Sequence, residues 1–516
     1  MNNWILLPVF LPILSGAVLL WCSFRSHLQL EGGKDQWKDL NEEEKKKLHT
    51  FVGAVLLITA ALALAAAWSG ERESILFYLM KDIPIYFHID AVGRLFVTFV
   101  SVVWVAVGFY SFGYMKHEGE ERRFFGFYLV VYGVLIALDF AGNLVTMYFF
   151  YEFMTLCSMP LVLHNGSKEA IMAALKYLFY SMCGAYLGLF GIFFLYRYCD
   201  TLTFTAGGTL NLAAISGHEW LLLAAVFAML IGFGAKAGMF PLHAWLPAAH
   251  PVAPSPASAA LSGIIVKSGV LAVIRVVYYV VGADFLRGTW VQTAWMTLAL
   301  ITVFMGSLLA FREPVLKKRL AYSTVSQVSY ILFGLALLQE EALGGALLHT
   351  VFHAFIKCAL FLTAGSIIYR TGMTKVKEMR GIGKIMPATL WCYTIASLAL
   401  IGIPPMSGFI SKWYLAQGAL SAPVSFFRYL GPAVLLISAL LTAGYLLPLT
   451  IDGFLPGKGC CTMFSAGSSS ETNHVKTEAP RCMLIPLAVL AGLSLVLGLF
   501  PNPLIEYVMN VASSLL

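Results

Sequence analysis

The sequence predicts an all-α polytopic membrane protein with about fourteen transmembrane helices. Of the 516 residues, 59% are hydrophobic and only 12% are charged, and the mean hydropathy is +0.79. A soluble protein of this composition would expose large apolar patches and aggregate. The composition therefore excludes an ordinary soluble enzyme, a disordered chain and a nucleic-acid-binding protein.

Fourteen runs are long and apolar enough to cross a bilayer, which takes about 20 residues in a helix. They cover approximately 4–22, 50–68, 92–115, 124–140, 143–164, 169–196, 219–246, 255–281, 289–311, 319–338, 341–369, 386–418, 427–453 and 483–510. The first run has no Lys or Arg before it, so it lacks the basic region of a signal peptide and we expect it to be retained.

The charges of the loops support this count and predict an orientation. The loops after the odd-numbered runs carry 22 Lys and Arg residues, and the alternate loops carry 5. Positively charged loops stay in the cytoplasm. We therefore expect a multi-pass protein of the cell (cytoplasmic) membrane, with both termini on the non-cytoplasmic side.

Two of the runs are predicted to be broken helices. In the seventh run, Pro241 lacks an N–H and lies among glycines, so the helix should break just after Lys236 and leave carbonyls facing a hydrated cavity. In the twelfth run, Gly402-Ile-Pro-Pro interrupts the helix beside Lys412. Interruptions at corresponding places are typical of inverted repeats.

These breaks suggest two inverted five-helix repeats, formed by the fourth to eighth and the ninth to thirteenth runs. The predicted units are an N-terminal part, 1–123, a first repeat, 124–281, a second repeat, 289–453, and a C-terminal helix, 483–516. The loops 23–49 and 456–481 are expected to be solvent-exposed excursions without chemistry of their own. The charged end of the first loop is interpreted as a solvated helix end.

Seven basic residues lie inside the predicted spans: Arg94, Lys176, Lys236, Lys267, Arg275, Lys357 and Lys412. The two arginines lie near helix ends, where a long side chain can reach the membrane surface. The five lysines would together cost roughly 12–17 kcal/mol if they faced lipid. We expect them to face the bundle interior, one another or water. A transport path explains five such lysines, whereas a structural hydrogen bond would explain a single one.

The clearest acid inside the spans is Glu152, which lies in mid-helix among aromatic residues. Burial favours the neutral forms of a carboxyl and an amine, whereas an adjacent opposite charge favours the charged forms. A buried Glu–Lys pair therefore holds its protons conditionally, and opening the pair prompts the lysine to release its proton. A static ion pair is the alternative interpretation.

The run 341–369 carries His349, His353 and Lys357 at steps of four residues. Each step turns by about 40° and rises about 6 Å, so the three groups share a sector of about 80°. Histidine titrates near neutrality, which makes this row a candidate proton relay. Structural core histidines are the alternative. Two histidines on one helix face cannot clamp a haem iron, and no thiolate or carboxylate stands nearby in sequence to complete a metal site.

Polar residues on the run 319–338 can hold water between relays or simply bond neighbouring helices. They are Tyr322, Ser323, Ser326, Gln327 and Tyr330. The nine cysteines form no C-x-x-C, and the chain has no glycine-rich nucleotide-binding motif. We therefore expect no cofactor and no redox centre in this chain.

Four stretches resemble the antiporter-like subunits of respiratory complex I and their relatives, the Mrp-type cation/proton antiporters and the membrane arms of energy-converting hydrogenases. They are Glu152 in its aromatic run, Lys236 with Phe240-Pro-Leu-His-Ala-Trp-Leu-Pro-Ala-Ala-His250, Leu320-Ala-Tyr-Ser-Thr-Val-Ser, and Gly402-Ile-Pro-Pro-Met-Ser-Gly-Phe-Ile-Ser-Lys412. The resemblance covers roughly residues 85–450 and is nearest the D-type subunit of the Mrp antiporters.

The resemblance implies fourteen helices, inverted repeats and a proton path along a central hydrophilic axis. Glu152 and Lys236 would form the switchable pair, Lys267 the central relay and Lys412 the terminal donor, and Lys176 matches a modulating basic position. The implied proton-path residues are Glu152, Lys236, Lys267, His349, His353, Lys357, Lys412, Lys176 and His243.

These features predict a proton-translocating subunit of a multisubunit membrane complex. Its expected partners are homologous antiporter-like and small membrane subunits, with peripheral iron–sulfur hydrogenase-type or quinone-reducing subunits as further candidates. Electron transfer or a cation gradient in these partners would drive it. The alternatives are a Mrp-type sodium/proton antiporter subunit without redox partners, a stand-alone secondary transporter of a small solute, and a haem-carrying redox enzyme.

Overall fold

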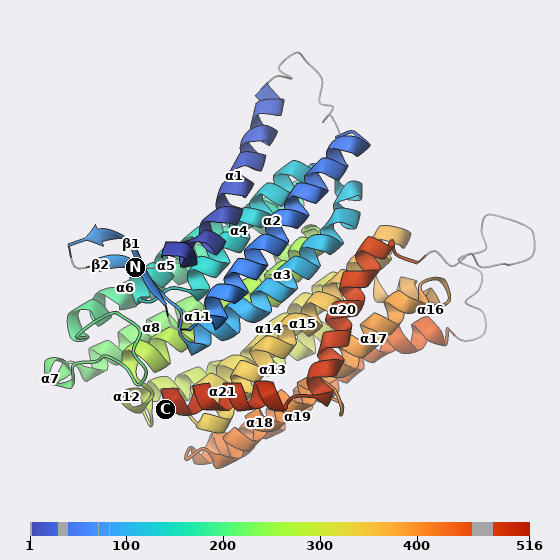
Figure 1. The fold of residues 1–516 in the computed structure, drawn as a ribbon. Coiled ribbons are helices and arrows are strands. Elements are labelled where there is room, and N and C mark those ends of the chain that lie inside the picture. The colour runs from blue at the N-terminus through green and yellow to red at the C-terminus, as the bar shows by residue number, and fades with distance from the viewer. Residues whose placement is uncertain (1–2, 29–39, 71, 82, 457–477) are drawn as a thin grey trace, which may run out of the picture.

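The computed structural model describes residues 3–28, 40–70, 72–81, 83–456 and 478–516. Long helices packed side by side make up most of the molecule (Figure 1). Among the described residues, 11 helices are long and apolar enough to cross a membrane. The predicted class of helical, multi-pass membrane protein is confirmed.

Three of the fourteen predicted spans are not among these 11 helices. One is α4 (Glu121–Asp139), which carries charged residues at both ends, and another is α14 (Leu316–Ala336), which begins with three consecutive basic residues after its first leucine. The third is divided into α17 (Pro387–Ile401) and α18 (Ser407–Ser421), each of 15 residues. The number of helices that cross the membrane stays a prediction.

The N-terminal part consists of η1 (Asn3–Leu6), α1 (Leu7–Leu28), α2 (Glu42–Trp68) and α3 (Ala91–Glu118). The charged run after Asn41 forms the first turns of α2. The Asn41 side chain accepts the N–H of Glu44 at 2.8 Å, and the Glu44 carboxylate accepts the N–H of Asn41 at 3.1 Å. This capping box begins a helix in solvent, as the sequence indicated. The remaining parts of the two predicted loops, residues 29–39 and 457–477, lie outside the described residues.

A β-hairpin between α2 and α3 is the one departure from the predicted all-α fold among the described residues. Its strands, β1 (Glu73–Met80) and β2 (Ile83–His88), pair in antiparallel fashion. They are rich in isoleucine, phenylalanine and tyrosine, which suit a half-buried pleated surface. The N–H of Tyr86 donates to Thr146 Oγ1 at 2.9 Å and attaches the hairpin to the start of the fifth helix.

The predicted first repeat contains one helix that changes its winding twice. Two π-helical stretches, η2 (Leu261–Ile265) and η3 (Arg275–Val281), interrupt it, and every residue from 253 to 283 is buried. The α-helices of this part, beside α4, are α5 (Leu144–Val162), α6 (Lys168–Tyr198), α7 (Leu212–Ile215), α8 (Glu219–Ala237), α9 (Leu246–Val252), α10 (Ser255–Ala260), α11 (Val266–Ile274) and α12 (Ala283–Leu286).

The second half surrounds α15, which is buried without interruption from Ala342 to Ile367. In Figure 1, α14 and α15 pass through the middle of the bundle. The elements of this half, beside α14, α17 and α18, are α13 (Trp290–Arg312), α15 (Glu340–Thr371), η4 (Val376–Met379), α16 (Ile382–Ile385), α19 (Ser425–Phe454), α20 (Arg481–Leu499) and α21 (Asn502–Leu515).

The last predicted span is not one helix. Pro501 follows the end of α20, and α21 then runs off at a large angle (Figure 1). Proline removes a backbone donor and cannot continue a helix at that place without a kink. The Tyr507 hydroxyl on α21 donates to the carbonyl of Ala91 at 2.8 Å, which ties the C-terminal helix to the start of α3.

Candidate functional site

Lys236 lies in the last turn of α8, next to the predicted break. The helix ends at Gly238, whose φ of 82° is a left-handed conformation that glycine adopts without steric cost. One detail differs from the prediction, because the Ala235 carbonyl does not face a cavity but accepts the Trp245 indole N–H at 2.9 Å. The helix dipole favours a cation in this last turn.

Three hydroxyl groups hold the fully buried amine of Lys236. Its Nζ donates to Thr155 Oγ1 at 2.7 Å, to the Tyr177 hydroxyl at 2.9 Å and to Ser181 Oγ at 3.3 Å. The Tyr177 hydroxyl also bonds Ser158 Oγ at 2.7 Å. These side chains come from α5 and α6, so the amine has its hydrogen-bond partners without any carboxylate.

Glu152 lies on α5 but forms no ion pair with Lys236 in the structure described. Its Oε1 accepts the Tyr148 hydroxyl at 3.0 Å, and its Oε2 is buried without a hydrogen-bond partner among the described residues. The neighbouring Phe153 and Leu156 are 45% and 50% exposed, so this side of α5 reaches the surface. The predicted pair is therefore open here, and its switching role stays a prediction.

Lys267 is the second residue after the first π-helical stretch. A π turn shifts the backbone hydrogen bonds, and such turns are frequent at functional sites. The carbonyl of Ser262 accepts Lys267 Nζ at 2.7 Å, and the same Nζ lies 2.6 Å from Nδ1 of His353 on α15. With Lys267 only 1% exposed, this contact joins the two predicted repeats in the buried interior.

His353 and His349 continue this row along α15. Their ring centroids lie 5.9 Å apart, and His349 Nδ1 hydrogen-bonds Ser411 Oγ on α18 at 2.9 Å. Both histidines are buried, and neither Nε2 atom has a hydrogen-bond partner among the described residues. The structure thus contains a buried row of titratable groups between α11 and α18, as the spacing on this helix suggested.

Lys412 reaches back across the second break. Its Nζ donates to the carbonyls of Leu400 at 2.6 Å and Ile401 at 2.9 Å, which the end of α17 leaves without helical partners. Gly402 ends that helix with a φ of 90°. Both breaks therefore have a lysine nearby, but only Lys412 bonds the carbonyls that the interruption leaves free.

An aromatic ring connects Lys412 with the histidine row. Lys412 Nζ lies 5.2 Å from the centroid of the Tyr330 ring, and that ring stacks on His349 at 5.7 Å. Lys357, farther along α15, is fully buried and donates to the carbonyl of Leu320 at 3.1 Å. It shares the helix with the row but has a separate partner.

Lys176 does not face the bundle interior, contrary to expectation. Its side chain is exposed on α6, and its Nζ lies 5.9 Å from the Tyr180 ring centroid. The buried face of α6 passes through Ala173, Tyr177 and Ser181, and the helical period turns Lys176 away from that face. Both sides of this helix are apolar in sequence, so hydrophobic patterning alone could not orient it.

Sequence reasoning selected His243 and overlooked its neighbour, His250. His243 is half-buried in the turn after α8, whereas His250 on α9 is fully buried with both ring nitrogens unpartnered among the described residues. The sequence did indicate His250, because it is the last residue of the stretch from Phe240 to His250 that carries the family resemblance. Lys317, counted with the loop charges, is only 6% exposed and donates to the Pro251 carbonyl at 3.3 Å.

The position of the Arg275 side chain is a second correction to the predictions. The sequence suggested a side chain reaching the membrane surface, but Arg275 is 1% exposed and forms two hydrogen bonds to Asp90, at 2.5 and 2.7 Å. Asp90 also accepts the N–H of Gly93 and caps α3. The guanidinium lies over the rings of Phe204 at 4.7 Å and Tyr279 at 4.5 Å. The partner is 185 residues away in sequence, so no local pattern indicates it.

The polar row on α14 mainly bonds neighbouring helices, in line with the simpler of its two interpretations. Ser323 bonds the Tyr445 hydroxyl at 2.6 Å, and the Tyr330 hydroxyl donates to the Leu435 carbonyl at 2.8 Å. Gln327 differs, because its buried amide nitrogen and oxygen have no partner among the described residues.

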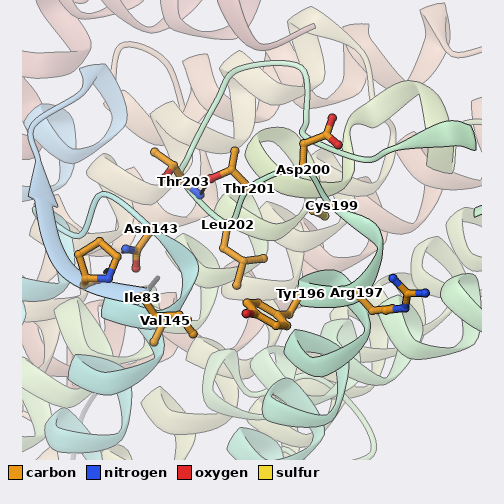
Figure 2. A pocket seen from close by; sticks show the side chains of 11 residues that line it. Ile83, Asn143, Val145, Tyr196, Arg197, Cys199, Asp200, Thr201, Leu202 and Thr203 are labelled. Carbon is orange, nitrogen blue, oxygen red and sulfur yellow. Dashed lines mark hydrogen bonds between the residues drawn. The ribbon is translucent and has the colours of Figure 1, made fainter. Parts of the chain in front are cut away.

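Figure 2 shows a pocket of about 420 Å³ where β2, the start of α5, the end of α6 and the following loop meet. Arg197 and Asp200 are its charged residues. It is lined by none of the nine predicted proton-path residues, so it is separate from the row described above.

Residues 141–438 match the family described as "NADH:quinone oxidoreductase/Mrp antiporter, TM". Residues 80–125 match "NADH-Ubiquinone oxidoreductase (complex I), chain 5 N-terminus". The first match covers more than half of the chain. The chain belongs to the NADH:quinone oxidoreductase/Mrp antiporter family.

Several relatives in this family are similar over most of their length. The NADH-quinone oxidoreductase subunit N of Desulforudis audaxviator is 32% identical, over 89% of this chain and 92% of that protein. A Na(+)/H(+) antiporter subunit of Alkalihalophilus pseudofirmus is 27% identical, over 100% and 98%. Hydrogenase-4 component B of Escherichia coli is 32% identical, over 82% and 63%.

The fold matches solved subunits of three membrane complexes. The TM-score is 0.80 for a chain of the archaeal membrane-bound sulfane sulfur reductase and 0.80 for one of the Dietzia sp. DQ12-45-1b Mrp complex, each 22% identical over 100% of this chain and 98% of that one. It is 0.75 for a chain of Thermus thermophilus complex I, 21% identical over 99% of both. The resemblance is confirmed, and this chain is an antiporter-like subunit of such multisubunit membrane complexes.

Proposed function

We propose that this subunit moves protons through the buried groups that join Lys236, Lys267, His353, His349 and Lys412. The observation that carries the proposal is the contact of 2.6 Å between Lys267 Nζ and His353 Nδ1. Charge on one of two adjacent bases disfavours charge on the other. The two groups therefore do not both hold a proton stably, and a proton that reaches one of them tends to be passed on. This behaviour suits a relay.

The remaining steps differ in how directly the groups meet. On the Lys412 side, Ser411 Oγ bonds His349 at 2.9 Å and Tyr330 lies between His349 and Lys412. Between Lys236 and Lys267, no side-chain hydrogen bond links the two amines among the described residues. The proposal requires water to bridge this interval, as ordered water bridges polar groups elsewhere.

Glu152 would act as the control of this path. Its approach to Lys236 would favour the charged amine, and its withdrawal would favour release of the proton. The half-exposed position of Glu152 and its unpartnered Oε2 support control from outside the chain, by movement of a neighbouring subunit.

The outward faces of α5 and α6 are the proposed docking surface for a membrane partner. Phe153 on α5 and Phe179 on α6 are 45% and 64% exposed, and Lys176 is exposed between apolar residues. A lysine facing lipid costs roughly 2.5–3.5 kcal/mol, so a partner that offers Lys176 an acceptor is favoured. Antiporter-like or small membrane subunits fit this description.

The assembly is proposed to lie in the cell membrane with both termini on the outer side, following the loop charges. Its driving force would be electron transfer in quinone-reducing or iron–sulfur hydrogenase-type partners, consistent with the names of two relatives. Because the chain carries no predicted redox centre, coupling must pass through contacts between subunits.

The test uses Lys267→Met and His353→Gln in the assembled complex, reconstituted in vesicles. We expect the rate of proton transport to fall at least about tenfold, equivalent to about 1.4 kcal/mol in barrier height, with assembly unchanged. The control is Lys384→Gln, an exposed lysine outside the row. Normal transport by both variants would refute the relay.

The second candidate is a subunit of a sodium/proton antiporter without redox partners. The similarity to the Na(+)/H(+) antiporter protein of Alkalihalophilus pseudofirmus over 100% of this chain favours it. Proton movement that requires a sodium gradient, and continues without an electron donor, would identify this alternative. A stand-alone transporter instead predicts activity from the purified single chain.

A further inference from the structure

A polar pocket opens where α2 begins and α3 ends, on the predicted cytoplasmic side. It has a volume of about 500 Å³ and is lined by Glu42, Lys45, Lys46, His49, Thr50 and Lys116. The lining itself carries three lysines and one carboxylate, and the buried carboxylate of Glu121 lies behind it, 4.0 Å from Lys45 Nζ. Such a pocket attracts an anion at the membrane surface.

The carboxylate that faces these lysines binds them weakly. Glu42 is 81% exposed and lies 3.8 Å from Lys45 and 3.7 Å from Lys116. Ion pairs with an exposed carboxylate are weak, so a phosphate can replace Glu42. Lys46 is exposed and forms no ion pair within the described part of the chain. The pocket therefore offers ammonium groups to an incoming anion.

A second space, an apolar groove, lies along α3 near this pocket. It runs between α2 and α20, both of which pack on α3. The groove is lined by Leu57, Ala60, Leu64, Ser101, Val102, Val105, Ala106, Phe109, Phe112, Cys482, Ile485, Pro486 and Val489. From Phe112 to Ser101 the helix rises about 16 Å. This length matches one leaflet, half of the ~30 Å hydrocarbon core.

His49 and Phe112 join the two spaces. Their rings stack at 4.8 Å, and His49 lines the pocket while Phe112 lines the groove. His49 Nε2 also bonds the buried Glu121 carboxylate at 2.5 Å, which fixes the imidazole at this junction. A single amphipathic molecule can therefore occupy both spaces, with its charge at the lysines and its chain in the groove.

The groove has a volume of about 510 Å³ and is open along its side. An extended hydrocarbon chain is much thinner than a helix, which is about 10–12 Å across, and fits within it. The lysines near one end favour an anionic headgroup, which a lipid carries together with such a chain.

We propose that this site binds one anionic phospholipid. Its phosphate lies among Lys45, Lys46 and Lys116, and one acyl chain lies in the groove between α2 and α20. The lipid would connect the N-terminal helices to α20. This assignment is independent of the proton path, whose residues lie elsewhere in the bundle.

The test is native mass spectrometry of the full-length chain in its complex, exchanged into phosphatidylglycerol or phosphatidylcholine. We expect the triple variant K45Q/K46Q/K116Q to retain at least tenfold less phosphatidylglycerol than the parent. Ala106→Phe, which fills the groove, should lower retention without altering the lysines. The control triple variant K47Q/K375Q/K384Q changes three exposed lysines outside the pocket and should retain the parent amount.

Three results would overturn the proposal. The first is equal retention of phosphatidylglycerol by the pocket variant and the control. The second is displacement of the lipid by inorganic phosphate at equal concentration, because a headgroup alone would then account for binding. The third is a partner subunit's helix found in the groove of the assembled complex.

Discussion

At the scale of single residues, the chain holds its buried lysines and its buried arginine in different ways. Lys236 is surrounded by hydroxyls, and Lys412 is bound by backbone carbonyls. Neutral acceptors satisfy an ammonium group but do not cancel its charge, so the amine can give up its proton. Arg275 remains charged at any accessible pH and has the carboxylate of Asp90 as its partner. The lysines suit proton transfer, and the arginine suits a fixed connection.

The first prediction concerns that connection. Asp90→Asn leaves the Arg275 guanidinium buried with only Asp139 as a nearby acid, and Asp139 Oδ2 makes no hydrogen bond among the described residues. Removing one partner of a buried ion pair typically costs about 3–5 kcal/mol. We expect a loss of this size in the free energy of unfolding, measured by denaturation in detergent micelles.

The matched control for this variant is Asp284→Asn. Asp284 pairs with Arg287 near the surface, where the two side chains are 83% and 39% exposed. Exposed pairs contribute about 0–1 kcal/mol, so this variant should be close to the parent. If Asp90→Asn and Asp284→Asn lowered the free energy of unfolding equally, burial of Arg275 would not explain the loss.

At the scale of elements, the interrupted helices organise the site. The break after α8 ends a helix beside Lys236, and the break after α17 leaves two carbonyls for Lys412. The π-helical stretch before Lys267 adds a third local departure from regular winding. At Lys267 and Lys412 the irregular backbone itself supplies the carbonyl acceptors, whereas the hydroxyl acceptors of Lys236 come from α5 and α6.

Gly238→Ala tests the first break. The φ of 82° at this residue is costly for a side chain, by roughly 1–2 kcal/mol. We expect a loss of stability of this size and slower proton transport, because Lys236 lies two residues earlier. Thermal unfolding and vesicle transport assays measure the two effects.

Gly492→Ala is the comparison for this variant, since it lies inside α20 with no neighbouring atom within 4 Å of an added Cβ. Alanine in a helix interior is favoured over glycine by about 0.5–1 kcal/mol, so this variant should be neutral or slightly stabilising. If Gly238→Ala behaved in the same way, the left-handed turn would not be needed for the break.

The sequence could predict those elements whose cause is local. Both breaks were predictable because glycine and proline stand close together there, as Gly238 with Pro241 and Gly402 with Pro404, whereas Gly492 and Pro486 lie inside a continuous helix. The π-helical stretch at Leu261–Ile265 was not, because its apolar residues suit a regular helix equally well. Its winding accompanies close packing, in which a Cβ added to Gly263 would lie 2.1 Å from Cys358 Sγ.

The site residues also divide into features with a local cause, which the sequence can predict, and features that depend on packing. Burial of most of these residues in the bundle was predictable from the cost of exposing charge to lipid, but their partners depended on distant segments. Lys267 and His353 are 86 residues apart, and the outward direction of Lys176 depends on how α6 packs. His250 could have been selected from the sequence, because it lies in the stretch that carries the family resemblance.

At the scale of the whole molecule, both ends of the proposed path approach the surface. Glu152 is half-buried on α5, and Lys412 is half-buried on α18. Figure 1 places α5 and α6 on the opposite side of the bundle from α18. If water bridges Lys236 and Lys267 as proposed, the path would connect these two sides and could be coupled to neighbours at either end.

The outward face of α5 and α6 gives the last prediction. Phe179→Cys places a thiol at a position that is 64% exposed in the single chain. If a membrane partner covers this face, a membrane-permeant maleimide should label the isolated subunit and label the assembled complex at least about tenfold more slowly. Leu440→Cys on α19, where the native side chain is 74% exposed, reports general access of the reagent. Equal labelling of Phe179→Cys in both states would assign this face to lipid, and Lys176 would then need its acceptor from a lipid headgroup or from water.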